Sequence, residues 1–531
     1  MRRNQPSPLT DSLLSCQTER NDSMLPYTFH TDRETIRKYR DNPEYLMDTG
    51  LSAAELSEKC DEIEADVKKS LTLRNAEILA FILDNARLEV CPYDLFADRM
   101  DHDNIFIKLR SRRRAIYREV SGDVLAETDI GHETAAYTGD DDFGHTTPDW
   151  PDILRLGVPG IIARLEDALS HADDASREFF AASLTVWQAF RRLILRFADA
   201  EARFAADHPV AAMAEKNFRA IADRAPETLA QALTLIALVY RTQTHVEGIN
   251  VRSLGRLDVQ CAPYLTDDIR EMEETLRYFI DRMNDRFVPA NIPITLCGED
   301  IAGDKDCLDF VLIFLKIYGE LANVSPKLQI RVGDHTPAVI IETVCRLIRS
   351  GCNSLLFCND NVVTAALIRN GHTPEDAMNY VMIGCYEPAS MGREISCTTN
   401  GRVSLPMAVE CALNGGRTML SDRPVGLECA EDFADFDAFF AEVKRQAAHF
   451  AEQSMRRTAA MERLYPSVCT SPFFSGGMAD CLASGRDVYA GGLTYNHSSV
   501  NIIGIATAAD SLAAIRKLVY EDGSHTLAEV R

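Results

Sequence analysis

The chain has 531 residues, of which 46% are hydrophobic, so it can bury a large core, and no Pro/Gly/Ser-rich linker divides it. Its formal net charge of −24 argues against nucleic acid and anionic membranes as partners, because phosphate groups are bound by clustered Lys and Arg. No apolar run reaches the roughly 18 residues of a membrane-spanning helix. Small molecules are therefore the expected ligands.

Fifteen cysteines are scattered along the chain, and no signal-peptide pattern precedes them. Reduced thiols in the cytoplasm are therefore expected rather than a disulfide framework. Zinc and iron–sulfur sites lack ligands, because there is no Cys-x-x-Cys pair, His-Glu-x-x-His motif or Cys-x-x-x-Cys-x-x-Cys cluster. A phosphate-binding loop and a dinucleotide-binding fingerprint are also missing, so no bound metal or cofactor is predicted.

The first residues, 1–25, are polar and irregular, which predicts a mobile N-terminal tail ahead of one large body over residues 26–531. Apolar residues at helical spacing predict helices from Thr31 to about residue 88, with a capping box made by Thr31 and Glu34. Long helices are predicted again over residues 160–245. Their buried faces are expected at Leu193, Ile194, Phe197, Leu233, Leu235, Ile236, Leu238 and Val239.

A loop is predicted between these helical stretches, at residues 140–150, from its Gly, Pro and Asp content. His145 is the candidate for chemistry in this loop, since an imidazole can donate or accept a hydrogen bond near neutral pH. The alternative is a histidine with a structural role. Four polar residues further on, His245, Glu247, Asn250 and Ser253, carry no predicted role.

Short runs with strand character alternate with helices in the second half of the chain, which predicts an α/β body. The strands are expected at residues 287–288, 294–296, 328–332 and 355–357, and the helices at 306–321, 338–349, 401–416 and 433–450. A further helix is predicted from a Thr373 cap through Tyr380 and Val381, and Gly384 is expected to end it.

The segment Gly384-Cys385-Tyr386-Glu387-Pro388 places a thiol and a carboxylate two positions apart. Pro388 favours an extended backbone at Glu387, and residues i and i+2 of an extended chain face the same side. Cys385 and Glu387 are therefore predicted to share one cavity, with Tyr386 turned away. The alternative is a buried structural cysteine beside a solvated glutamate.

This Gly-Cys-x-Glu-Pro segment resembles the active-site motif of the glycyl radical enzymes, the pyruvate formate-lyase-like family, in their eliminase or dehydratase branch. Further landmarks follow the family's order: Gly255-Arg256-Leu257-Asp258, Pro263-Tyr264, Ser325-Pro326-Lys327-Leu328, Asn359-Asp360, Gly491-Gly492-Leu493-Thr494-Tyr495-Asn496 and Ala509-Asp510-Ser511-Leu512. The resemblance covers roughly residue 26 to the end. It implies a ten-stranded α/β barrel of two five-stranded halves, surrounded by helices.

The resemblance also implies a mechanism. A radical S-adenosylmethionine activating enzyme would install a protein-based glycyl radical, which would oxidise Cys385 to a thiyl radical. Glu387 would move protons, so that water or another group is eliminated from a small polar metabolite such as a polyol or hydroxy acid. His145 occupies the place where several eliminases of this family bind a substrate oxygen, and the expected assembly is a homodimer.

Other readings of the resemblance stay open. They are radical cleavage of a C–C bond or decarboxylation, and an inactive paralogue that binds a polar metabolite. Pyruvate formate-lyase itself uses two adjacent cysteines, whereas Tyr386 follows Cys385 here, so acyl transfer to a second thiol is disfavoured.

The end of the chain predicts two further helices. One is expected from Thr507 to a stop at Gly523, and Thr526 with Glu529 forms a capping box two residues from the last residue. The family carries its radical on the glycine of an Arg-Val-Ser/Ala-Gly-Tyr/Phe loop near the C-terminus, and these 531 residues contain no such motif. We therefore expect a barrel that is incomplete at its C-terminus and an enzyme that needs this loop, from a longer or a second polypeptide, for activity.

Overall fold

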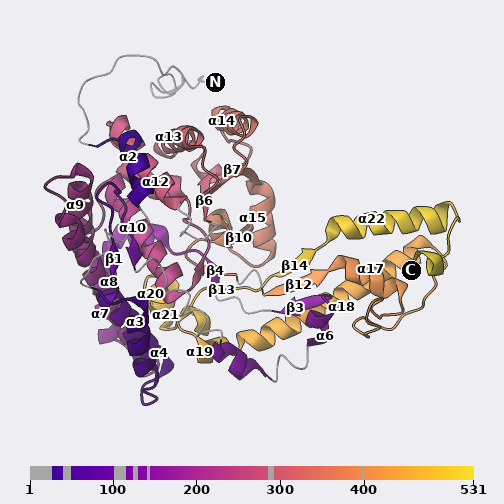
Figure 1. The fold of residues 1–531 in the computed structure, drawn as a ribbon. Coiled ribbons are helices and arrows are strands. Elements are labelled where there is room, and N and C mark those ends of the chain that lie inside the picture. The colour runs from indigo at the N-terminus through magenta and orange to yellow at the C-terminus, as the bar shows by residue number, and fades with distance from the viewer. Residues whose placement is uncertain are drawn as a thin grey trace. The chain divides into compact units, whose positions relative to one another are not determined.

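A computed structural model of the chain describes residues 27–39, 50–100, 115–122, 129–139, 144–284, 292–384, 386–396 and 400–531. The chain forms two compact units, drawn as ribbons in Figure 1. Unit 1 comprises Met1–Ser111, Thr146–Ile395 and Thr470–Tyr495, and unit 2 comprises Arg112–His145, Ser396–Cys469 and Asn496–Arg531. The predicted N-terminal tail lies outside the described residues.

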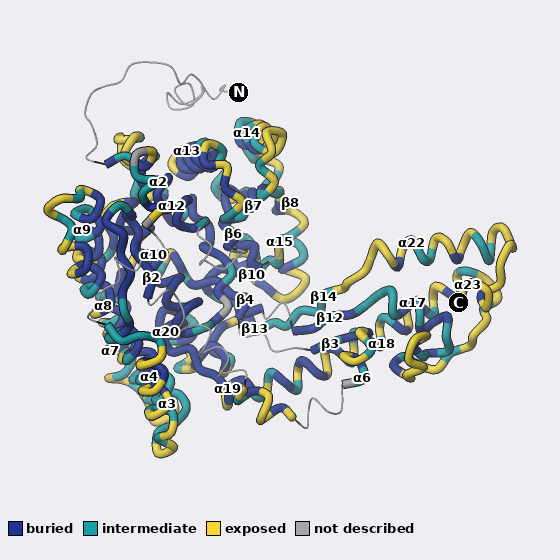
Figure 2. The backbone as a smooth tube through the Cα atoms, viewed as in Figure 1, coloured by how far each residue is buried: buried dark blue, intermediate teal, exposed yellow. Residues whose placement is uncertain are grey.

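Long helices make up the first part of unit 1: α2 (Phe29–Tyr39), α3 (Ala53–Glu64), α4 (Leu71–Asn85), α7 (Trp150–Ser170), α8 (Arg177–Ala202), α9 (Pro209–Asp223) and α10 (Leu229–Arg241). Helix α8 packs against α4, α7 and α9, and Trp187 and Phe190 on its inner side are fully buried. The apolar residues predicted to face the core are all buried, including Leu193 and Phe197. Dark blue in Figure 2 marks this interior.

The predicted start of the first helix is wrong, because α2 begins at Phe29 and Thr31 lies inside its first turn. The backbone N–H of Phe29 donates to Glu274 Oε2 at 2.7 Å, so a carboxylate distant in sequence occupies the helix N-terminus. The capping box of α3 is local, since Ser52 and Glu55 satisfy each other's backbone N–H groups.

A parallel three-stranded sheet forms the α/β part of unit 1, in the order β6 (Pro293–Cys297), β7 (Lys327–Val332) and β8 (Leu355–Asn359). In its register Ile294 lies opposite Leu328, and Leu328 lies opposite Leu355. Helices α13 (Lys305–Leu321), α14 (Ala338–Arg349) and α15 (Asp360–Arg369) connect or follow these strands (Figure 1). The predicted strands at 294–296, 328–332 and 355–357 and both intervening helices are thus confirmed, whereas residues 287–288 lie outside the described residues.

Most of the remaining elements of unit 1 are short. The helices are the π-helix η3 (Thr242–Glu247), α11 (Leu257–Cys261), η4 (Ala262–Tyr264), α12 (Ile269–Met283), η5 (Glu299–Ile301), α16 (Pro374–Met378), α20 (Pro472–Gly476), α21 (Ala479–Ser484) and η6 (Val488–Ala490). The strands are β1 (Leu88–Glu89), β2 (Arg99–Met100), β4 (Gly144–Thr146), β5 (Asn250–Val251), β9 (Tyr380–Ile383), β10 (Glu387–Ser390), β11 (Glu394–Ile395) and β13 (Tyr495–Asn496), of which β4 and β13 have residues in both units. They form a β1–β2 pair, a β10–β9 hairpin and a sheet of order β13–β11–β4–β5.

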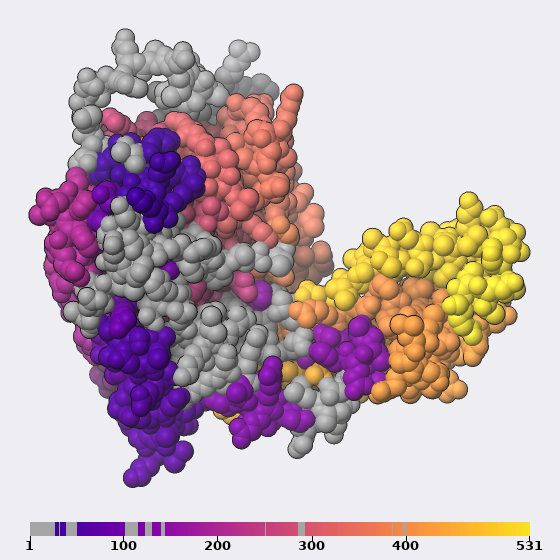
Figure 3. Space-filling view, viewed as in Figure 1, coloured from indigo at the N-terminus to yellow at the C-terminus, as the bar shows by residue number. Residues whose placement is uncertain are grey.

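Unit 2 is built on a second three-stranded sheet, in which β12 (Gly401–Ser404) runs parallel to β14 (Val500–Ile503) and antiparallel to β3 (Tyr137–Gly139). Its helices are α6 (Asp129–Glu133), α17 (Leu405–Leu413), α18 (Phe436–Glu462), α19 (Tyr465–Val468), α22 (Ile505–Ile515), η7 (Arg516–Glu521) and α23 (Leu527–Val530). Phe439 and Phe450 of α18 are buried in its core. Figures 2 and 3 show α22 on the surface of this unit.

Three predictions for unit 2 have clear outcomes. The capping box of Thr526 and Glu529 is confirmed, because each side chain binds the other residue's backbone N–H. The helix predicted to start at Thr507 begins earlier, at Ile505, after Gly504 with φ 75°. Residues 401–404 form β12 rather than helix. No helix among the residues that the structure describes is long and apolar enough to cross a membrane.

Candidate active site

The predicted catalytic segment closes the hairpin of β9 and β10. The strands are antiparallel, with Ile383 opposite Glu387 and Tyr380 opposite Ser390, so the chain turns between positions 383 and 387. Gly384 has φ 54°, and the N–H of Tyr386 donates to the carbonyl of Ile383 at 3.1 Å. The segment therefore forms a tight turn at the end of a strand that is buried along its whole length.

The prediction that a helix continues through Tyr380 and Val381 is wrong. Helix α16 ends at Met378, and the four apolar residues that follow form β9. A buried strand reads as a continuous apolar run, which over four residues has no periodicity that separates it from a helix face.

Of the two predicted catalytic residues, Cys385 lies outside the described residues and Glu387 is the first residue of β10. Glu387 is half-buried, and its extended conformation before Pro388 agrees with the prediction. The extended backbone does not continue through Tyr386, which has φ 111°. The alternation argument for a shared cavity therefore does not cross the turn, and the juxtaposition of Cys385 and Glu387 stays a prediction.

Tyr386 holds a backbone conformation that costs a non-glycine residue roughly 1–3 kcal/mol. Its ring is half-exposed and lies beneath the ammonium group of Lys327, with Nζ 5.3 Å from the ring centroid. A cation over an aromatic face is attracted to it. Lys327, which belongs to one of the family landmarks, thus contacts the turn from the first residue of β7.

The hairpin is anchored to the parallel sheet through backbone groups. The N–H of Met382 donates to Thr295 Oγ1 at 3.2 Å, and the N–H of Gly384 donates to the carbonyl of Arg252 at 3.1 Å. Thr295 in turn donates its own N–H to the carbonyl of Gly255 at 3.0 Å. Strand β9 and the segment before α11 therefore both attach at the middle of β6.

The Gly255-Arg256-Leu257-Asp258 landmark owes its residue types to close packing. Gly255 has φ 81°, and a Cβ there would lie 2.0 Å from the side-chain nitrogen of Gln260. Arg256 binds Asp300 through both terminal nitrogens, at 2.6 and 2.9 Å. Asp258 is fully buried and accepts from the N–H groups of Val259 and Cys297. Burial raises the pKa of Asp258 to about 6, although Arg256 opposes the shift.

A buried ion pair holds the β10 side of the hairpin, and sequence reasoning missed it. His372 Nε2 lies 2.8 Å from Glu394 Oε2, and the same oxygen accepts from the N–H of Ser390 at 2.8 Å. The ring of His372 stacks on Tyr495 with centroids 4.1 Å apart. Burial alone would lower the pKa of His372, but the Glu394 carboxylate outweighs it and the pKa is raised. The single available signal was Tyr495, which stands in a family landmark.

His145 lies in β4 rather than in a loop, is buried and has φ 52°. Its carbonyl accepts from the N–H of Ser396 at 3.3 Å. The structure assigns His145 to unit 2 and the hairpin to unit 1, so its contact with a substrate oxygen stays a prediction.

Three of the polar residues without a predicted role have structural contacts. The carboxylate of Glu247 accepts from the backbone N–H groups of Phe473 and Phe474, at 2.8 and 3.0 Å, and so occupies the N-terminus of α20. Ser253 Oγ accepts from the N–H of Gly255 at 3.0 Å. The side chain of His245 contacts Thr244 Oγ1 at 2.8 Å inside the π-helix η3.

Several buried thiols are unsuited to nucleophilic chemistry. Burial raises the pKa of Cys261, Cys297 and Cys481 well above that of an ordinary thiol, so each stays protonated and weakly nucleophilic.

A family model described as pyruvate formate lyase-like matches residues 105–531, which include the hairpin and the landmarks around it. The chain belongs to this family. Among curated members it is 24% identical over 445 residues to the (2S)-3-sulfopropanediol dehydratase of Klebsiella oxytoca, covering 77% of this chain and 53% of that protein. It is 25% identical over 320 residues to the trans-4-hydroxy-L-proline dehydratase of Clostridioides difficile, covering 56% and 40%. The chain thus spans about half the length of these relatives.

Solved structures of pyruvate formate lyase-like proteins share the fold. The glycerol-bound form of the B12-independent glycerol dehydratase from Clostridium butyricum superposes with a TM-score of 0.77 and 20% identity, over 90% of this chain and 70% of that one. The α/β barrel class predicted from the resemblance is therefore confirmed. Of the expected barrel strands, the described residues show the parallel segment β6–β7–β8.

Proposed function

We propose that this chain carries the catalytic hairpin of a glycyl radical dehydratase, which eliminates water or another group from a small polar metabolite such as a polyol or hydroxy acid. The observation that carries the proposal is the turn of β9 and β10, where a Cys-x-Glu-Pro segment closes a buried hairpin tied to the parallel sheet. The relatives named above support the reaction class, since they are dehydratases of hydroxylated compounds.

Cys385 and Glu387 would divide the chemistry between a hydrogen atom and a proton. A protein-based glycyl radical, installed by a radical S-adenosylmethionine activase, would supply the oxidising equivalent that converts the thiol of Cys385 to a thiyl radical. Cys385 would take a hydrogen atom from a substrate carbon and return one to the product, which regenerates the thiyl radical. The reaction has no net redox change.

Glu387 would remove the hydroxyl proton of the substrate radical while the neighbouring C–O bond breaks, and the proton would leave with the hydroxide as water. The position of Glu387 supports this role. Its backbone is fixed because it is the first residue of β10, which pairs with a strand attached to the parallel sheet, while its half-buried side chain stays accessible to substrate. His145 would bind a substrate oxygen. We further propose that the enzyme acts as a homodimer in an anaerobic cytoplasm, where thiols are reduced and oxygen is absent.

Elimination from known compounds tests the proposal. The protein, together with the family's glycine loop, is activated anaerobically with activase and S-adenosylmethionine and is given glycerol, (2S)-3-sulfopropanediol and trans-4-hydroxy-L-proline as probes, and dehydrated products are measured by mass spectrometry. Glu387→Gln should lower the turnover of whichever probe reacts by a factor of about a hundred to ten thousand, the usual contribution of a general acid or base. Glu375→Gln, an exposed carboxylate on α16, is the matched control and should leave turnover unchanged.

Two results would contradict the proposal. One is the absence of dehydrated product from all three probes and from other diols and hydroxy acids, with the radical present. The other is equal turnover by the Glu387→Gln and Glu375→Gln variants. Release of carbon dioxide without dehydration would favour the decarboxylase alternative.

A further inference from the structure

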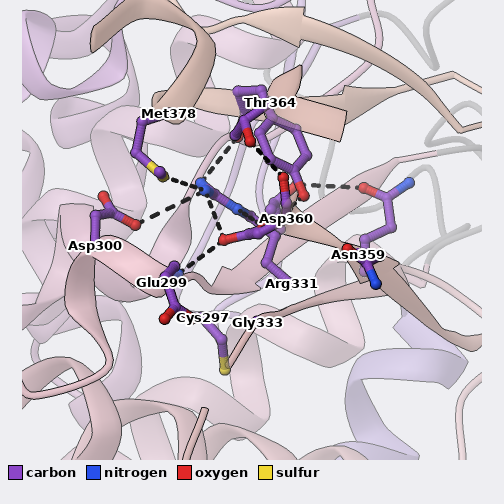
Figure 4. A network of polar contacts seen from close by, with 12 residues as sticks. Cys297, Glu299, Asp300, Arg331, Gly333, Asn359, Asp360, Thr364 and Met378 are labelled. Carbon is purple, nitrogen blue, oxygen red and sulfur yellow. Dashed lines mark hydrogen bonds and ion pairs between the residues drawn. The ribbon is translucent and has the colours of Figure 1, made fainter. Parts of the chain in front are cut away.

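A second polar network lies at the root of the hairpin, where β9 begins, and is centred on a buried arginine (Figure 4). Arg331 of β7 is fully buried, and it binds the carboxylate of Asp360 through two nitrogens, with Nε–Oδ1 at 2.9 Å and Nη2–Oδ2 at 3.0 Å. Asp360 follows β8 directly and is also buried. A bidentate pair of this kind fixes direction as well as distance.

Tyr380, the first residue of β9, contacts this pair in three ways. Its hydroxyl donates to Asp360 Oδ1 at 2.6 Å, and its carbonyl accepts from Arg331 Nη1 at 3.2 Å. The guanidinium of Arg331 also lies over its ring, 4.1 Å from the centroid. The side chain and the backbone of Tyr380 are therefore both held, by Arg331 of β7 and by Asp360, the first residue of α15.

The charges of the network persist at neutral pH. Burial raises the pKa of Asp360, but Arg331 outweighs it and the pKa lies below the ordinary value. Burial lowers the pKa of Arg331, but Asp360 raises it above the ordinary value. The carboxylate also accepts from the N–H of Glu299 at 2.8 Å, which joins the end of β6 to the same group.

The hairpin register connects this network to the turn. Tyr380 pairs with Ser390, whose N–H is bound by Glu394, and Ile383 at the far end pairs with Glu387. The first and last residues of β9 are three residues apart, which is about 10 Å along a strand. Because β9 is buried throughout, a shift at its root moves the turn instead of being absorbed by solvent-exposed backbone.

We propose that Arg331, Asp360 and Tyr380 form a root clamp that positions the catalytic turn, with Tyr380 as the positioning residue that transmits the clamp to Glu387. The inference rests on the proposed function for the catalytic role of the turn. A positioning role differs from a purely structural role in its consequence. Loss of the clamp should lower the rate of the chemical step by more than the loss of stability explains.

Tyr380→Phe tests the clamp, since it keeps the ring over Arg331 and removes the hydroxyl bound to Asp360. The matched control is Tyr278→Phe, because Tyr278 of α12 is also fully buried and donates its hydroxyl to a carboxylate, that of Asp32 on α2. In the activated enzyme, Tyr380→Phe should lower kcat roughly ten- to hundredfold with KM changed less than about twofold, because small displacements of catalytic groups have effects of this size. Tyr278→Phe should leave kcat unchanged.

Hydrogen exchange tests the clamp without activity. In the 531-residue chain, the amides of β9 and β10 should exchange roughly ten- to hundredfold faster in Tyr380→Phe than in Tyr278→Phe, since a hydrogen bond to a charged group is lost at the root. Amides of α8 should be unaffected. If the hairpin amides exchange at the same rate in both variants, or if both variants have the same kcat, the clamp is refuted. Failure of dehydration by the wild-type enzyme would refute the proposed function and leave the clamp to be judged by exchange alone.

Discussion

Substitution of Asp360 by asparagine probes the most heavily bonded carboxylate near the hairpin. Asp360 accepts from two nitrogens of Arg331, from the hydroxyl of Tyr380 and from the N–H of Glu299. Asn retains the size of Asp but loses the charge, and its NH₂ group would face a donor. The guanidinium of Arg331 would remain buried without the carboxylate that binds it through two nitrogens, and Asp300, 3.8 Å from Nη2, would be left as its ion-pair partner. Breaking a buried ion pair from one side costs about 3–5 kcal/mol, a large part of a domain's stability of about 5–15 kcal/mol.

Tryptophan fluorescence during urea unfolding measures this cost in unit 1. The chain contains two tryptophans, and both Trp150 and Trp187 are buried within unit 1. The free energy of unfolding of Asp360→Asn should be lower than that of the wild type by about 3–5 kcal/mol at pH 7. The double variant Arg331→Met/Asp360→Asn should recover part of the loss, because the buried charge is removed together with its partner.

The pH dependence has a definite sign. The folded pKa of Asp360 lies below its ordinary value of 3.8, so its stabilisation is fully present above that pH and is lost as the pH falls through the folded pKa. The difference between wild type and Asp360→Asn should thus be constant from pH 6 to 8. A loss below about 1 kcal/mol at pH 7, which is the size of an ordinary exposed ion pair, would refute the buried-pair reasoning. A double variant whose loss equals the sum of the single losses would do the same.

Further predictions concern the other supports of the site. The pKa of His372 is raised in the folded state, so the stabilisation from its pairing with Glu394 is fully present below the ordinary pKa of 6.5 and is lost as the pH rises through the folded pKa. The free energy of unfolding of the wild type should therefore decline more between pH 6 and 9 than that of His372→Gln. Parallel pH profiles of the two proteins would contradict this. Gly255→Ala should lower the free energy of unfolding, measured with urea and tryptophan fluorescence, by roughly 1–2 kcal/mol for the left-handed backbone alone, and an unchanged value would exclude the predicted contact with Gln260. With pyruvate and coenzyme A the activated enzyme should release no formate, because Tyr386 stands where a second thiol would be needed. Formate detected by chromatography would contradict this prediction.

The parallel α/β segment could be predicted from sequence with little error. Residues 338–349 form α14 with the predicted bounds, because the apolar spacing is helical and the glycine at 351 follows its end. Strand β7 was predicted from its apolar and β-branched run, and only its first residue, Lys327, was missed. These elements have local signals that agree with their tertiary environment.

The hairpin and its supports could not be predicted in the same way. The run Tyr380 to Ile383 is apolar in every position, so burial on both faces removes the alternation that marks a strand. The contacts of Arg331 with Asp360 and of His372 with Glu394 join residues 29 and 22 positions apart, and charge alone does not reveal which residues pair. Resemblance to a family identified Cys385 and Glu387 as candidates, whereas the groups that hold the hairpin could be identified only from the structure.

The central claim is that Cys385 carries the hydrogen-atom transfer, and one measurement on Cys385→Ser tests it most directly. Radical content by EPR and turnover are measured on the same anaerobic sample of the protein, together with the family's glycine loop, after activation with activase and S-adenosylmethionine. Cys385→Ser should give the glycyl radical doublet at wild-type intensity and no detectable product, since an alcohol O–H bond is too strong for the radical to break. Cys345→Ser, an exposed cysteine on α14, is the control and should keep both signal and turnover. Turnover by Cys385→Ser at a rate near that of Cys345→Ser would contradict the account.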